Sequence, residues 1–316
     1  MDISDIIQIV NDRTGLKCYS GDDEKLKVEV IPFGIPPLDN RIGGGLPRGR
    51  IIIIDGEFQS GKTFLCQQVI KSAQNFGLSV AYFNVEQKLD PDWFVKTGID
   101  ISNIAVIQGN VAESIFDSVM DLIENGVGVI ILDSLTAMVP ISESEDEMDK
   151  QTIGLQARVF SKGFRKMVGK LSDSQTTVVI TSQKRSGMGP YSPDLNPGGK
   201  ASYFYSSLIL NVRRKEWKED ENKEKIGYMM AVKSMKNNIA VPWRECAFPF
   251  YFVNGGVDMV EIVAEEAVSR KIVEKSGAWF YYGSEKFHGW NVFLSFLRNN
   301  DQILAEIQEK LDRKTG

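Results

Sequence analysis

The sequence contains a single histidine, His288, and three cysteines in 316 residues. No other histidine or cysteine lies near His288, which argues against histidine acid–base catalysis and against a His-ligated metal site. Cys18, Cys66 and Cys246 are far apart and form no C-x-x-C pair. This usage predicts buried thiols in a reducing compartment, because disulfide frameworks and zinc sites need several closely spaced cysteines.

Excess positive charge and long apolar runs are also missing. The formal net charge is −5, so any contact with nucleic acid must come from a local basic surface. Apolar runs such as 51–54 are far too short to span a bilayer. The first residues, MDISDIIQIVNDR, carry acids where a signal peptide carries bases. We therefore expect a cytoplasmic protein that makes no contact with membranes.

Apolar residues make up 42% of the chain and charged residues 25%, which is typical of a globular protein with a substantial core. From Arg50 onward, short apolar runs alternate with amphipathic stretches. Strands that alternate with helices favour an α/β fold with a mostly parallel sheet covered on both faces. The predicted strands are 51–55, 79–86, 127–133, 177–182, 208–213 and 228–232, and the predicted helices are 62–75, 112–124 and 153–171.

The two ends of the chain differ in pattern from this middle part. Residues 3–12 predict a short amphipathic helix, and an extended segment follows at 27–33. Residues 257–274 and 289–311 are helical in pattern, and AWFYYG between them predicts a small hairpin. The resulting division is an N-terminal segment (1–32), an α/β core (33–255) and a small α+β C-terminal domain (256–316).

A phosphate-binding loop follows the first core strand. The segment GEFQSGKT is a complete G-x-x-x-x-G-K-[ST] motif between a predicted strand and a predicted helix. Its glycines let successive N–H groups face phosphate oxygens, and the helix N-terminus adds positive potential. Lys62 would reach the β- and γ-phosphates, and the Thr63 hydroxyl would bind Mg²⁺. The predicted nucleotide-binding residues here are Gly56, Glu57, Phe58, Gln59, Ser60, Gly61, Lys62, Thr63 and Phe64.

Three further polar residues follow predicted strands. Asp133 ends VGVIILD, where a carboxylate can hold Mg²⁺ through water. Glu86 ends AYFNVE and has the chemistry of a general base for the attacking water. Gln183 ends VVITSQ, and its amide could sense the γ-phosphate. For Glu86 and Gln183, the residues alone leave a turn position and a catalytic role equally open.

Two basic regions favour contact with a polyanion. The segment KRSGMGPYSPDLNPGGK is a long Gly/Pro/Ser-rich connection with Lys184, Arg185 and Lys200 and a single acid. Loops of this length inside compact domains are usually functional or disordered. In helix 153–171, an apolar stripe opposes a stripe of four cations, which is either a DNA-binding face or a solvated face. The cations are Arg158, Lys162, Arg165 and Lys166; the apolar residues are Ile153, Ala157, Phe160, Phe164, Met167 and Leu171.

Six motifs in order resemble those of the bacterial RecA recombinases. They are GEFQSGKT, FNVEQKLDPDW, VIILDSLTAMVP, IGLQAR, VVITSQKR and NPGGKASYFYSS, and GAWFYYGSEKFHGW is similar to the C-terminal domain of that family. The resemblance runs from about Ile31 to the C-terminus. It implies a RecA-type P-loop NTPase core, hydrolysis of ATP with Mg²⁺, and a helical filament on single-stranded DNA that pairs with a homologous duplex.

The resemblance also implies roles for single residues. Glu86 takes the position of the catalytic glutamate, and Gln183 that of the γ-phosphate sensor. Asp90 would contact the adenine, and Trp93 would stack on it. Subunit contacts would involve Phe204 and Lys236, the latter reaching the neighbour's ATP. The implied DNA-binding residues are Arg158, Arg165, Lys184, Arg185, Gly198, Gly199 and Lys200.

Some features depart from the family pattern. Asn238 stands where the family has a second lysine after Lys236, and the acidic run 143–149 corresponds to the first DNA loop of the family. We expect part of this run to act as an N-terminal acid cluster for the helix that follows. A divergent or phage-borne member would account for such departures. Two other functions remain open, a non-exchanging paralogue that regulates another recombinase and a DNA motor on the same core.

Overall fold

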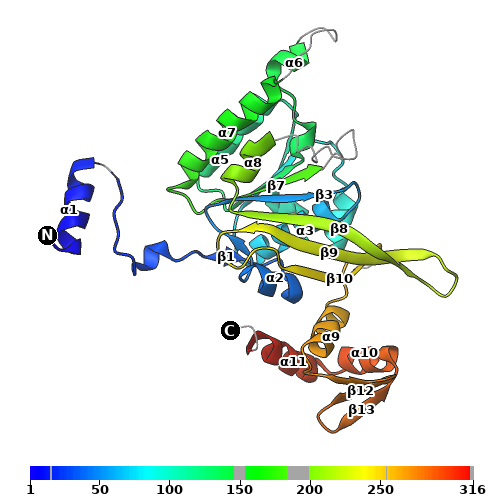
Figure 1. Ribbon diagram of the computed structural model, residues 1–316. Coiled ribbons are helices and arrows are strands. Elements are labelled where there is room, and N and C mark those ends of the chain that lie inside the picture. The colour runs from blue at the N-terminus through cyan, green and yellow to red at the C-terminus, as the bar shows by residue number, and fades with distance from the viewer. Residues whose placement is uncertain (15, 146–153, 184–198, 254, 314–316) are drawn as a thin grey trace, which may run out of the picture.

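A twisted sheet of eight strands forms the centre of the molecule (Figure 1). The computed structural model describes residues 1–14, 16–145, 154–183, 199–253 and 255–313. The strand order is β10-β9-β8-β3-β7-β6-β4-β5. The six strands from β8 to β5 in this order run parallel, and β9 and β10 extend the sheet antiparallel. This confirms the mostly parallel α/β sheet predicted from the sequence.

The sheet strands are β3 (Ile51–Gly56), β4 (Val80–Asn84), β5 (Ile104–Gln108), β6 (Val129–Asp133), β7 (Thr177–Gln183), β8 (Leu208–Glu219), β9 (Lys225–Asn237) and β10 (Glu245–Tyr251). The helices around it are α2 (Pro36–Ile42), α3 (Lys62–Asn75), α4 (Pro91–Lys96), α5 (Ala112–Glu124), α6 (Ile141–Glu145), α7 (Leu155–Leu171) and α8 (Gly199–Tyr205). A two-stranded sheet pairs β1 (Val30–Ile31) with β2 (Leu46–Pro47).

Strand β3 is a fully buried strand with helices on both of its faces. Its isoleucines alternate between two cores, because successive side chains of a strand point to opposite faces. Ile52 and Ile54 belong to the core with α2 and α3, whereas Ile51 and Ile53 belong to the core with α5 and α7. The continuous apolar run is therefore the signature of a parallel strand covered on both sides.

Helix α7 places its apolar stripe against α5. Phe160 and Phe164 pack edge-on against Phe116, and a Cβ at Gly163 would lie 2.6 Å from the Phe116 ring. Glycine at this position therefore lets the two helices approach closely. The prediction that Ala157 belongs to the apolar stripe is wrong, because this residue is exposed. Ile153 lies outside the described residues.

The sequence patterns missed the two edge strands, β5 and β10. Strand β5 contains the apolar run IAVI, but its side chains are only half-buried or exposed, because the strand lies at the edge of the sheet. Strand β10 contains Pro249, and proline is tolerated in a sheet at an edge strand such as this one.

The C-terminal residues form a separate small core. Helix α9 (Met259–Ser269) leads into a three-stranded sheet of β11 (Glu274–Ser276), β12 (Trp279–Tyr282) and β13 (Glu285–His288). The predicted hairpin is therefore part of a larger sheet. The predicted helix 289–311 is two helices, α10 (Trp290–Arg298) and α11 (Asp301–Arg313), because the amide side chains of Asn299 and Asn300 hydrogen-bond carbonyls of the last turn of α10.

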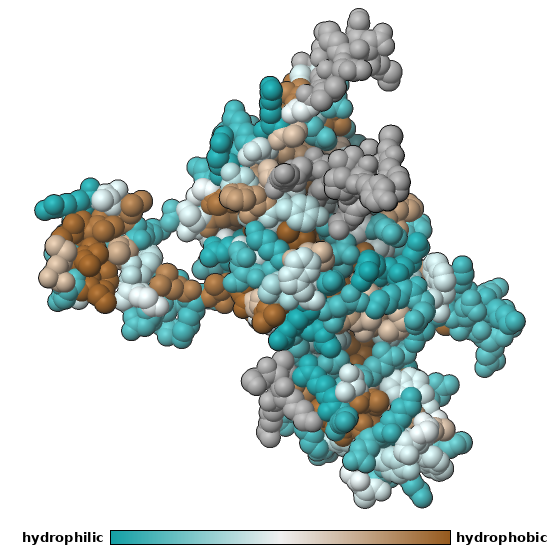
Figure 2. Space-filling view, viewed as in Figure 1, coloured by the Kyte–Doolittle hydropathy of each residue, from teal (hydrophilic) through white to brown (hydrophobic). Residues whose placement is uncertain are grey.

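The N-terminal helix, α1 (Ile3–Thr14), projects away from the rest of the chain (Figure 1). None of its residues is buried, and Ile3, Ile6 and Ile9 are exposed. Figure 2 shows the resulting apolar surface on this helix. Among the described residues, no helix combines the length and the apolar character needed to cross a membrane.

Candidate nucleotide-binding site

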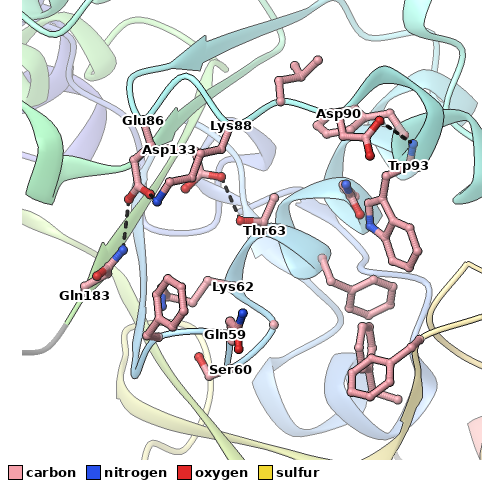
Figure 3. A pocket seen from close by; sticks show the side chains of 18 of the residues that line it. Gln59, Ser60, Lys62, Thr63, Glu86, Lys88, Asp90, Trp93, Asp133 and Gln183 are labelled. Atoms are coloured by element: carbon pink, nitrogen blue, oxygen red, sulfur yellow. Dashed lines mark hydrogen bonds and ion pairs between the residues drawn. The ribbon is translucent and has the colours of Figure 1, made fainter. Parts of the chain in front are cut away.

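Four parallel strands bring the predicted catalytic residues to one edge of the sheet. Gly56 at the end of β3 is in register with Gln183 at the end of β7, and Asn84 of β4 is in register with Asp133 of β6. Glu86 lies two residues beyond β4 instead of at its last position. Ligand sites of open α/β sheets lie outside the carboxyl ends of the strands. A cavity of about 730 Å³ opens at this edge (Figure 3).

The loop between β3 and α3 has the backbone shape that its glycines permit. Gly61 has φ +99°, and a Cβ there would lie 2.2 Å from Cε of Met230. At Gly56 a Cβ would lie 2.3 Å from the carbonyl oxygen of Val212. Gly61 is therefore favoured by its left-handed backbone, and Gly56 is required by the close approach of the β8 backbone. The loop ends where α3 begins, at Lys62, so the N–H groups of the first turn are free to bind an anion.

The side chains of this loop suit a polyphosphate. The Lys62 ammonium donates to the carbonyl oxygens of Gly56 at 3.1 Å and Glu57 at 2.6 Å. Burial lowers the pKa of Lys62, while the nearby carboxylates of Asp133 and Glu86 oppose that shift. The Ser60 hydroxyl is buried without a hydrogen-bond partner. Phosphate oxygens would supply negative charge to the Lys62 ammonium and an acceptor to the Ser60 hydroxyl.

Thr63 and Asp133 lie together, as a shared metal ion would require. The Thr63 hydroxyl donates to Asp133 Oδ2 at 3.0 Å (Figure 3). The Asp133 carboxylate also accepts from the hydroxyls of Tyr82 at 2.8 Å and Thr181 at 2.6 Å, which fix its orientation. No group of three His, Cys, Asp or Glu side chains suited to a metal ion occurs among the described residues. A magnesium ion would therefore need phosphate oxygens and water besides these two residues.

Glu86 and Gln183 are in direct contact. The Gln183 amide donates to Glu86 Oε1 at 3.1 Å, and the Ser134 hydroxyl donates to the same oxygen. Lys88 forms an ion pair with Glu86 Oε2 at 2.7 Å. Burial alone would raise the pKa of Glu86, but the hydrogen bonds from Lys88, Ser134 and Gln183 outweigh it and lower the pKa. Glu86 is therefore held ionised, which is the state that a general base needs.

The far end of the cavity is aromatic. Asp90 accepts from the backbone N–H groups of Asp92 and Trp93 and so begins α4, which leaves Trp93 half-buried at the cavity wall. Facing this wall, the Phe250 ring lies 4.9 Å from Phe64 and 5.0 Å from Tyr228, measured between ring centroids. The sequence patterns did not point to several residues that line this cavity: Lys88, Arg214, Trp217, Tyr228, Phe250 and Phe252.

Comparisons with known proteins agree with this geometry. The RecA N-terminal domain family model matches residues 6–257, and the RecA C-terminal domain model matches residues 262–316. The chain belongs to the RecA family. It is 38% identical to Protein RecA of Acidothermus cellulolyticus over 301 residues, 94% of this chain and 87% of that protein. It is also 38% identical to Protein RecA of Thermus aquaticus over 296 residues, 92% of this chain and 87% of that protein.

Two residues that the RecA resemblance assigns to subunit contacts meet at α8. Phe204 is 75% exposed, as an unassembled contact residue would be. The Lys236 ammonium donates to the backbone carbonyl oxygens of Tyr203 at 3.1 Å and Phe204 at 3.0 Å. Burial lowers the pKa of Lys236. The carbonyl groups at the end of α8 thus hold the lysine that the resemblance places across the interface.

The cationic stripe of α7 is on the surface. Arg158, Lys162, Arg165 and Lys166 are all exposed, and within the described ranges none of them forms an ion pair. Lys184, Arg185 and Gly198 lie outside the described residues, and for Gly199 and Lys200 only the backbone, at the start of α8, is described.

The described part of the acidic run 143–149 does not act as predicted. Its first residues belong to α6, and α7 begins only at Leu155 with no acid in its first turn. The described acids of the run, Glu143 and Glu145, thus belong to α6 and not to the first turn of α7. Residues 146–149 lie outside the described ranges.

Proposed function

We propose that this RecA-family protein is an ATP-dependent DNA recombinase that forms a helical filament on single-stranded DNA and pairs it with a homologous duplex. The contact between Glu86 and Gln183 carries the proposal. Gln183 is the last residue of β7, and the basic segment that begins at Lys184 follows it directly. One side chain therefore connects the hydrolytic carboxylate to the segment expected to bind DNA.

In this proposal each residue of the nucleotide site has one task. Bound ATP with Mg²⁺ supplies the phosphoryl group that is transferred to water. Lys62 neutralises charge on the β- and γ-phosphates, and Thr63 and Asp133 hold the metal ion. Glu86 accepts a proton from the attacking water, since its pKa keeps it ionised. Asp90 and Trp93 contact the base at the aromatic end of the cavity.

The DNA surface is proposed on the exposed cations of α7 and on the segment that precedes α8. Arg158 and Arg165 would contact phosphates, which carry no sequence information. This suits an enzyme that must accept any strand and leave recognition to base pairing. Residues 143–149 would add little attraction, because phosphate is repelled by their carboxylates.

Filament formation is supported by surfaces that the single chain leaves uncovered. The apolar residues of α1 are exposed to water in the single chain. An exposed apolar surface of this kind usually marks a site of contact with another protein. We assign residues 1–32 to contact with a neighbouring subunit. Phe204 would contact a neighbour as well, and Lys236 would reach its ATP. Asn238 leaves this interface one lysine short of the family pattern, so Lys236 alone would stabilise transition-state charge from across the interface.

Steady-state ATP hydrolysis and strand exchange test the proposal together. Hydrolysis should be strongly stimulated by single-stranded DNA and rise cooperatively with protein concentration. A circular single strand and a homologous linear duplex should give joint molecules, whereas a heterologous duplex should give none. Equal hydrolysis with and without DNA would contradict the coupling. DNA-stimulated hydrolysis without joint molecules would indicate a regulatory paralogue instead.

A further inference from the structure

A carboxylate that has no role in the proposed chemistry lies at the base of the nucleotide loop. Asp55 is 0% exposed and stands between the four isoleucines of β3 and Gly56. Burial of a carboxylate is strongly unfavourable unless it is paired and hydrogen-bonded. The groups that satisfy Asp55 therefore indicate what this residue does.

Two hydrogen-bond donors to Asp55 come from elements outside the nucleotide loop. The Tyr203 hydroxyl of α8 donates to Asp55 Oδ2. The Asn211 amide of β8 donates to Oδ1 at 2.6 Å, from the position in register with Asp55. The negative charge of Asp55 also opposes the loss of charge on Lys62 that burial favours. The carboxylate thus joins α8 and β8 to the start of the nucleotide loop.

Helix α8 carries groups that the proposed function assigns to the neighbouring subunit. Phe204 follows Tyr203 directly, and the Lys236 ammonium is bound to the carbonyl oxygens of both residues. The helix begins at Gly199, directly after the segment proposed to bind DNA. A change in the position of α8 would therefore reach Phe204, Lys236 and, through Tyr203, Asp55.

We propose that the hydrogen bond from Tyr203 to Asp55 couples the position of α8 to the nucleotide loop of the same subunit. Tyr203 is then a positioning residue, which touches neither ATP nor DNA. When DNA or a neighbouring subunit fixes α8, the bond would fix the end of β3 and so the loop that begins at Gly56. This inference rests on the proposed function, because it requires hydrolysis that responds to DNA.

The test compares Tyr203→Phe with Tyr205→Phe. Both changes remove one hydroxyl from α8, but no hydrogen bond of the Tyr205 hydroxyl occurs within the described part of the chain. A hydrogen bond to a charged group corresponds to roughly ten- to hundredfold in an equilibrium. Tyr203→Phe should therefore reduce the DNA-stimulated kcat about tenfold, with KM for ATP and DNA-independent hydrolysis close to wild type. Tyr205→Phe should behave as wild type.

The other possible results decide between loss of the coupling and loss of the proposed function. DNA stimulation of Tyr203→Phe equal to that of wild type overturns the coupling and leaves the proposed function intact. A Tyr203→Phe variant that binds ATP weakly and loses DNA-independent hydrolysis as much as DNA-stimulated hydrolysis has lost a purely structural bond, which also overturns the coupling. Absence of DNA stimulation in the wild type overturns the proposed function and this inference with it. If the bond is the link, Asp55→Asn combined with Tyr203→Phe should lower stimulation no further than the more severe single variant.

Discussion

Replacement of Glu86 by glutamine should separate ATP binding from ATP hydrolysis. The carboxylate accepts from Gln183 and Ser134 on one oxygen and from Lys88 on the other. A glutamine keeps one acceptor but presents an NH₂ group to the remaining donors, and it cannot accept a proton. Loss of a general base slows turnover by about 10² to 10⁴, which adds roughly 3 to 5 kcal/mol to the barrier.

The effect on folding should be much smaller than the effect on the barrier. Lys88 is largely exposed, with 66% of its side chain accessible, and ion pairs of this kind contribute less than about 1 kcal/mol. Nucleotide affinity should be measured by titration of a fluorescent ATP analogue. It should stay within about threefold of wild type, which corresponds to a change in binding free energy of about 0.7 kcal/mol. Single-turnover hydrolysis on single-stranded DNA measures the chemical step. Near-normal turnover in Glu86→Gln would refute the assigned role.

Three further results are expected. Lys88→Met should move the acidic limb of the kcat/KM profile to higher pH, because Lys88 helps lower the pKa of Glu86 and the base works only above that pKa; an unmoved limb would contradict this. Lys62→Met should abolish hydrolysis, because the charge on the β- and γ-phosphates is no longer neutralised. It should also raise the melting temperature of the nucleotide-free protein at neutral pH, because burial lowers the pKa of Lys62 and the folded state therefore disfavours the charged ammonium. Gly61→Ala should weaken ATP binding and destabilise the fold by about 1–3 kcal/mol in thermal unfolding, whereas Gly169→Ala, which meets open space on α7, should do neither.

A fourth expectation concerns the DNA surface. Arg158→Ala and Arg165→Ala should each flatten the salt dependence of single-strand binding by about 0.7 in log–log slope, equally on two unrelated oligonucleotides. Fluorescence anisotropy titrated with salt measures this slope. Wild-type binding by both variants would mean that the stripe on α7 is only a solvated face.

Local patterns predicted the elements whose sequence signal is strong over a short window. Helix α3 was predicted at 62–75 and has those bounds in the structure, because a complete loop motif fixes its start and an apolar stripe runs along it. The edge strands were missed although both contain short apolar runs, because the run in β5 has only four residues and the run in β10 is interrupted by Pro249, which is unfavourable inside a sheet. The single C-terminal helix was wrong because periodicity continues across Asn299 and Asn300, where the backbone turns.

The residues of the candidate site also fall into those that local sequence patterns predict and those that only the fold brings together. The loop motif and the strand-end carboxylates were predicted, since their residue types and spacing are local features. At the aromatic end of the cavity, Phe64 and Trp93 were named from the sequence, but Phe250 could not be predicted, because Phe64 and Phe250 are far apart in the sequence and meet only through the sheet order. The same holds for the hydrogen bonds of Asp55, which join residues 148 and 156 positions apart.

Electron microscopy of the protein with single-stranded DNA and a non-hydrolysable ATP analogue tests the central claim most directly. The account predicts regular helical filaments that require both the DNA and the nucleotide, because ATP would lie between subunits that contact each other through α1 and Phe204. Filaments should become rare when Phe204 is replaced by alanine, since its exposed ring would lose the contact with the neighbour. Closed rings, or single particles under the same conditions, would contradict the account.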